Sequence, residues 1–103
     1  MTTPLHALVG LKVTKATIVH DYAQLAFGDE IGISIYNEFE LSPDVRLEDL
    51  ISKTVLRVEE SSNSIEISFL DGVKLAIDLH RQAYRGPEAL ELNRTGHPTI
   101  VWN

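Results

Sequence analysis

Two long runs of the chain alternate between apolar and polar residues. Residues 31–41 carry an apolar side chain at nearly every second position, beginning with Ile31, and residues 73–79 do the same, beginning with Val73. Successive side chains of a β-strand point to opposite faces, so this period of two predicts strands with one buried face and one exposed face. We therefore expect a strand over each run.

Shorter alternating runs predict four further strands. They lie at residues 13–19, 22–27, 55–59 and 64–69. Asp71-Gly72 separates the last of these runs from residues 73–79, and Asp-Gly between alternating runs favours a tight hairpin, because both central residues of such a turn need positive φ. The sequence therefore predicts two three-stranded meanders.

A short helix is predicted before each meander. Leu47, Leu50 and Ile51 recur at helical spacing, after Ser42-Pro43-Asp44, which offers an N-cap and a proline for the first helical position. Thr3-Pro4 provides the same features before the first meander. We expect neither helix to exceed about three turns.

The two meanders are internal repeats. Residues 5–37 align with residues 47–79 at a constant offset of 42, without a gap. Most matched pairs are apolar or lie in turns, as in Leu5/Leu47, Leu8/Leu50, Val13/Val55, Phe27/Phe69, Asp29/Asp71, Ile33/Leu75 and Ile35/Ile77. We interpret the match as a shared core, and we expect one domain over residues 1–103, with repeat 1 at 5–41, repeat 2 at 47–79 and a C-terminal hairpin at 80–103.

The expected fold is mainly β with short helices. An isolated meander is not stable, so the two helix-β-β-β repeats should pair through their apolar faces, as a sandwich or a partly open barrel with approximate two-fold symmetry. The last 24 residues have no counterpart in the first repeat. Residues 89–92 and 99–102 suggest two strands around the Thr95–Pro98 turn, and this hairpin should close the sheet.

Composition and charge exclude several classes of function. The chain has 103 residues, no cysteine and a net charge of -6, which argues against binding of nucleic acid or anionic membranes. The lack of cysteine excludes thiol catalysis and zinc-thiolate sites, and fits a reducing compartment. Because residues 1–78 hold 13 acids against 6 bases, the repeats form the acidic part. We expect a cytoplasmic protein without a cofactor.

No established catalytic motif is present in the sequence. Asp78 and His80 would share one strand face, and such a pair can act as a base with its orienting carboxylate, or as two metal ligands. Alternation turns that face to solvent, so a hydrated pair is the favoured interpretation. Glu38 and Glu40 also share a face and are interpreted as a polar row in solvent. We predict no catalytic and no metal-binding residues.

The C-terminal segment supplies the best candidates for an interaction or ligand site. Tyr84, Arg85 and Glu88 lie in a turn-rich stretch outside the repeats, and Trp102 lies beside the last residue. Aromatic residues and arginine are enriched at recognition hot spots, and loops often carry function. The alternative is that Tyr84 and Trp102 only plug one end of the core. The candidate site is therefore Asp78, His80, Tyr84, Arg85, Glu88 and Trp102.

One pattern occurs twice in the chain: Leu-[Val/Ile]-x-x-x-Val, a [Leu/Ile]-x-Phe strand, an Asp turn and an [Ile/Leu]-x-Ile strand. It is followed by Tyr-Arg-Gly-Pro-Glu-Ala-Leu-Glu-Leu (residues 84–92) and Ile-Val-Trp (residues 100–102). This pattern resembles a group of small bacterial proteins of unknown function, over nearly the whole chain. The resemblance implies an uncharacterised bacterial cytoplasmic protein, and it implies no catalytic residues.

Three functions remain open from the sequence. The first is a non-enzymatic binding module that neutralises a basic protein partner, as an immunity protein neutralises a toxin, because electrostatic steering suits such inhibition. The second is a small-molecule or enzymatic site in a cleft between the repeats, with Asp78, His80, Tyr84 and Arg85 as the residues to test. The third is a homodimer paired through exposed edge strands.

Overall fold

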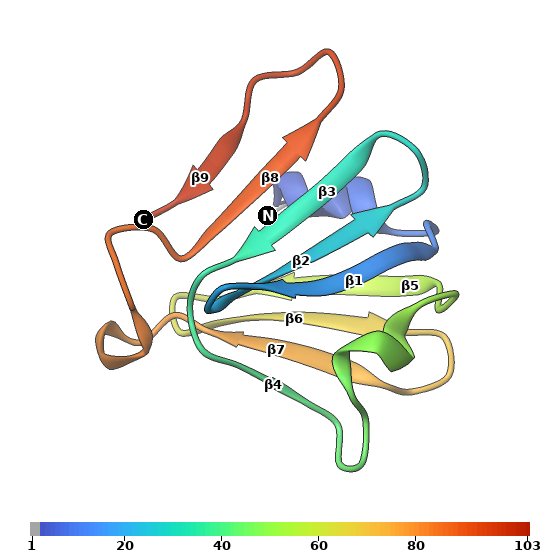
Figure 1. Ribbon diagram of the computed structural model, residues 1–103, viewed down its shortest axis with the longest axis horizontal. Helices are drawn as coiled ribbons and strands as arrows, with labels where there is room; N and C mark the ends of the chain where they lie inside the picture. The colour runs from blue at the N-terminus through green and yellow to red at the C-terminus, as the bar shows by residue number, and fades with distance from the viewer. Residues whose placement is uncertain (1–2) are drawn as a thin grey trace.

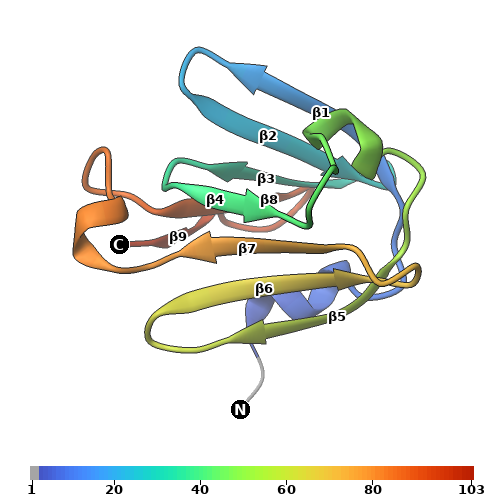
Figure 2. The ribbon, with the colours of Figure 1, turned by 90° about the horizontal axis from the view of Figure 1, so that it is seen from below.

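The computed structural model describes residues 3–103. Strands make up 48% of the chain and helical turns 12%, so the fold is mainly β, as predicted. Two antiparallel sheets pack face to face and do not close into a barrel (Figures 1 and 2). The first has the order β1-β2-β3-β8-β9 and the second β4-β7-β6-β5. Their bounds are β1 Val13–Val19, β2 Tyr22–Phe27, β3 Ile31–Ile35, β4 Phe39–Leu41, β5 Val55–Glu60, β6 Ser64–Phe69, β7 Lys74–Asp78, β8 Leu90–Arg94 and β9 Ile100–Trp102.

The alternating residues form the core between the sheets. This core consists largely of fully buried leucines, isoleucines and phenylalanines of both meanders: Leu25, Phe27, Ile33, Ile35, Ile65, Ile67, Phe69, Leu75 and Ile77. Equivalent strands of the two meanders contribute equivalent residues, because the apolar positions recur at the offset of 42.

The helical segments within residues 3–103 include none with the length and hydrophobicity of a membrane span.

The strand expected over residues 31–41 is wrong in one respect. The run is divided into β3 and β4, which belong to different sheets. The break lies at Asn37, which is buried, and the amide N–H groups of Tyr36 and Asn37 both donate to the carbonyl of Ala89, at 2.9 and 3.2 Å. The chain therefore leaves the first sheet after Ile35 and enters the second at Phe39.

The helices are short 3₁₀ turns, η1 Pro4–Leu8, η2 Leu47–Leu50 and η3 Arg81–Ala83. Thr3 caps η1, and its hydroxyl accepts a hydrogen bond from the amide of Leu5. The cap predicted for the second helix is wrong. Asp44 has a positive φ of 65°, which interrupts a helix, and η2 begins only after Arg46. The Ser42 hydroxyl instead accepts from the amide of Lys74.

The 3₁₀ turns η1 and η2 each pack on the opposite meander. The turn η1 contacts β5, and η2 contacts β1. Hydrogen bonds between the two repeats, called units from here on, occur in matched pairs 42 residues apart. The amide of Gly10 donates to the carbonyl of Val55 at 2.9 Å, and correspondingly the amide of Ser52 donates to the carbonyl of Val13 at 2.8 Å. Lys12 and Thr54, themselves 42 apart, form the bridge between the units. This is the geometry of an approximate two-fold axis.

The expectation that the last segment has no counterpart in the first repeat needs correction. β4 follows the first meander and pairs with β7 of the second, while β8 follows the second meander and pairs with β3 of the first. Phe39 and Leu41 lie opposite Ile77 and Leu75, as Leu90 and Leu92 lie opposite Ile35 and Ile33. The offset from β4 to β8 is 51 instead of 42, so nine residues are inserted before β8. Among the strands of residues 3–103, β9 alone lacks an equivalent.

Candidate functional site

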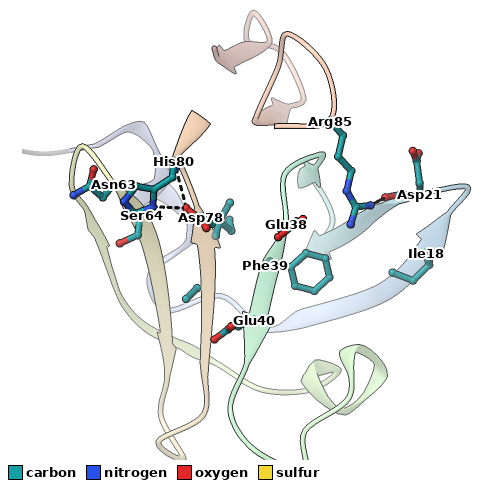
Figure 3. A pocket seen from close by; sticks show the side chains of 12 residues that line it. Ile18, Asp21, Glu38, Phe39, Glu40, Asn63, Ser64, Asp78, His80 and Arg85 are labelled. Atoms are coloured by element: carbon teal, nitrogen blue, oxygen red, sulfur yellow. Dashed lines mark hydrogen bonds and ion pairs between the residues drawn. The ribbon is translucent and has the colours of Figure 1, made fainter. Parts of the chain in front are cut away.

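A cleft of about 800 Å³ extends from the edge strand β1 across β4 to the ends of β6 and β7. Its walls come from the β1–β2 turn, from β4, from the ends of β6 and β7, and from the nine-residue insertion (Figure 3). In Figure 2 the β1–β2 hairpin lies on one side of β4, and β7 lies on the other. The part of the cleft between β1 and β4 lies where the two sheets separate.

The floor of the cleft is apolar. Ile18 is paired with the buried Ala23, so it points to the inner face of its sheet, yet it is 59% exposed because no strand covers it. Phe39 is paired with the buried Ile77 and is half-buried. The core of the sandwich therefore reaches the surface between these two side chains.

Carboxylates dominate the rim. Asp21, Glu38, Glu40 and Asp78 line the cleft, and Arg85 is the one lysine or arginine among the lining residues within 3–103. The Arg85 guanidinium donates to the backbone carbonyl of Asp21 at 2.7 Å, and this contact ties the insertion to the β1–β2 turn at one end of the cleft (Figure 3). Four negative charges face one positive charge, so the rim attracts cations.

Asp78 and His80 are in contact on this rim. The carboxylate Oδ1 of Asp78 accepts from the backbone N–H of His80 at 2.8 Å and lies 2.7 Å from the ring Nδ1. These two hydrogen bonds, the backbone one first, hold the pKa of Asp78 below its ordinary 3.8, so the group is ionised at neutral pH. Both side chains are about half exposed, 42% for Asp78 and 52% for His80.

The other three candidates do not line this cleft. Tyr84 is partly buried and packs against the core. Glu88 lies on a smaller hollow of about 170 Å³ with Tyr22 and Tyr36, whose rings are 5.0 Å apart. Trp102 packs on the core from β9, and its indole N–H donates to Glu60 Oε2 of β5 at 3.0 Å. Of the six candidates, Asp78, His80 and Arg85 share one site.

The sequence did not predict the apolar floor of the cleft, and it predicted Glu38 and Glu40 of the rim only as a polar row in solvent. Glu38 and Glu40 alternate with Phe39, which is a usable signal of an amphipathic strand, but nothing in the sequence indicated that this strand is an edge. Ile18 and Asp21 gave no signal, because they reach the cleft only through the packing of the two sheets. Within residues 3–103, no group of three or more His, Cys, Asp or Glu side chains could hold a metal ion.

Comparisons with models of protein families, with curated proteins and with solved structures found no match to this chain.

Proposed function

We propose that this protein is a binding module without catalytic activity, and that the acidic cleft beside β4 receives a basic protein partner. The observation that carries the proposal is the rim of four carboxylates, Asp21, Glu38, Glu40 and Asp78, around an apolar floor. Charged rims accelerate encounter and select the partner, while buried apolar contact supplies most of the affinity. An immunity-like neutralisation of a basic protein fits this pattern.

A displayed library of random peptides tests the proposal with a defined probe. We expect the selected peptides to be rich in Lys and Arg, and to bind less tightly at about 1 M salt than at about 0.01 M salt, because salt screens exposed charges. Selection of neutral or acidic peptides would contradict the proposal.

A matched pair of double variants shows where the peptides bind. Glu38→Gln with Glu40→Gln removes two charges from the rim, whereas Glu30→Gln with Glu59→Gln removes two exposed charges outside the cleft. The net charge of the two proteins is the same. If only the first protein loses binding, the result supports the cleft as the site. If both proteins lose binding equally, the peptides bind elsewhere.

A small-molecule site is the second candidate function. The volume of about 800 Å³ lies within the range of small-molecule pockets, which is about 300–1,000 Å³, and the Asp78–His80 pair lies on its rim. No hydrogen bond joins this pair to a hydroxyl in the part of the chain that the structure describes, so the contacts favour binding over nucleophilic catalysis. A thermal-shift screen of small cations and metabolites with wild type and His80→Asn tests this candidate.

A further inference from the structure

A strand position beside β4 is empty, although the equivalent position beside β8 is filled. The approximate two-fold axis relates β4 to β8, since each follows one meander and completes the sheet of the other. β9 pairs with the outer edge of β8, with Leu90 opposite Trp102 and Leu92 opposite Ile100. Beyond β4 there is no such strand in the described residues (Figure 1). The part of the acidic cleft that Ile18 and Phe39 line lies in that position.

The outer edge of β4 has backbone N–H and C=O groups that could pair with another strand. Glu38 and Ser42 face β7, because the carbonyl of Glu38 accepts from the amide of Asp78 at 3.0 Å, and the amide of Ser42 donates to Lys74 at 3.1 Å. Backbone groups alternate between the two sides of an antiparallel strand, so the N–H and C=O groups of Phe39 and Leu41 point toward the cleft. Leu90 and Leu92 turn the same groups toward β9.

Side chains divide a strand in this position into two faces. Residues opposite Phe39 and Leu41 would face inward, over Ile18 and the open core, as Trp102 does opposite Leu90. A residue opposite Glu40 would face outward, among the carboxylates of the rim. The position therefore fits an extended segment in which apolar and basic residues alternate.

We propose that an extended segment of the basic partner adds to β4 as an antiparallel strand, with lysine or arginine facing Glu40 and apolar side chains covering Ile18 and Phe39. This inference rests on the proposed function and adds the binding mode, which is strand addition to an exposed edge. Main-chain hydrogen bonds to Phe39 and Leu41 hold the segment, and the alternation of side chains selects it.

A second copy of this chain fits the position less well. Pairing of two β4 strands about a two-fold axis through Glu40 would place the two Glu40 carboxylates opposite each other, and like charges directly opposite destabilise a pair of strands. A basic segment of a partner protein would offset the repulsion among the carboxylates of Glu38, Glu40 and Asp78. Charge complementarity therefore favours a different protein as the occupant.

A short synthetic peptide in which lysine alternates with isoleucine, valine and tryptophan is the probe. On binding, the amide protons of Phe39 and Leu41 should become protected from exchange with solvent. Those of Glu38 and Glu40 should change little, because the first donates to Ala83 and the second faces β7. Methylation of the peptide nitrogens that would bond to β4 should abolish the protection and most of the binding.

Protein variants separate this inference from the proposed function. Glu40→Lys should weaken binding of the peptide by at least about tenfold, since a like charge then faces lysine, whereas Glu30→Lys, the same change at an exposed turn outside the cleft, should leave it nearly unchanged. Equal binding of the N-methylated and unmodified peptides, both sensitive to Glu40→Lys, would overturn strand addition and leave the acidic cleft as a binding site. If no basic peptide binds and light scattering shows a dimer, both proposals fail.

Discussion

Glu88 and Glu91 place two carboxyl groups close together at the end of the insertion. A hydrogen bond with Glu91, burial and the charge of Glu91 all raise the pKa of Glu88 above its ordinary 4.5. A carboxyl group with a raised pKa in the folded state binds more protons when folded than when unfolded, so its contribution to stability falls as the pH rises from about 4.5 through the folded pKa. At neutral pH the ionisation of Glu88 therefore opposes folding.

Glu88→Gln should therefore stabilise the protein at pH 7. Glutamine carries no charge, and its amide can still donate to the carboxylate of Glu91. The gain in unfolding free energy, measured by urea denaturation, should disappear below pH 4.5, where Glu88 is protonated in both states. Glu30→Gln removes one charge from an exposed turn and is the control. A gain that does not depend on pH would show that the repulsion is not its cause.

Asn37 shows what residue-level reasoning could not foresee. Its position in the alternating run suits an ordinary strand residue, yet its side chain is 2% exposed and its Nδ2 donates to the carbonyl of Asp78 at 2.8 Å. That partner lies 41 residues away. Because the bond depends on the packing of two sheets, no local pattern could indicate the break between β3 and β4.

At the scale of elements, the two junctions that follow the 3₁₀ turns form a natural comparison. Gly10 follows η1 with φ 86°, and Ser52, 42 residues later, follows η2 with φ 77°. Both amides donate across the units, to Val55 and Val13. Left-handed backbone suits glycine and strains a residue with a Cβ, by about 1–2 kcal/mol.

Exchange of these residues should change stability in opposite directions. Gly10→Ala should lower the free energy of unfolding by about 1 kcal/mol, and Ser52→Gly should raise it by up to about 1 kcal/mol. A Cβ at Gly10 would meet no atom within 4 Å, so the loss reflects backbone strain and not a clash. Urea denaturation measures both variants, and the double variant Gly10→Ser with Ser52→Gly should lie near wild type. A stabilising Gly10→Ala would contradict this account.

Sequence predicted the elements better than their connections. Alternation predicted both meanders, because a buried face imposes the period of two on β2, β6 and β7 almost residue for residue. In β1 the alternation is interrupted by a register shift between Val13 and Lys15. The equivalence of β4 and β8 escaped notice, since the inserted residues break the constant offset. The cleft escaped notice for the same reason, because its wall at Arg85 belongs to that insertion and its floor at Ile18 and Phe39 depends on which strands are edges.

At the scale of the whole molecule, each unit completes the other. β4 belongs to the sheet of the second meander, and β8 belongs to the sheet of the first. The turn η1 of the first repeat packs on β5 of the second, and η2 of the second repeat packs on β1 of the first. Neither half of the chain therefore contains a complete sheet with its covering turn. Folding should be cooperative across the entire molecule, because the core forms only between the two halves.

Separate halves should be unfolded and should fold on mixing. The fragments 1–44 and 45–103 each keep one meander but lose the opposite sheet, and a meander with an exposed apolar face is not stable in water. Each fragment alone should give the circular dichroism and narrow amide dispersion of an unfolded chain, and an equimolar mixture should recover the spectrum of the intact protein. The intact chain is the reference for the native spectrum. A fragment with native amide dispersion on its own would show that one unit folds independently, and the crosswise contacts would then be dispensable for its fold.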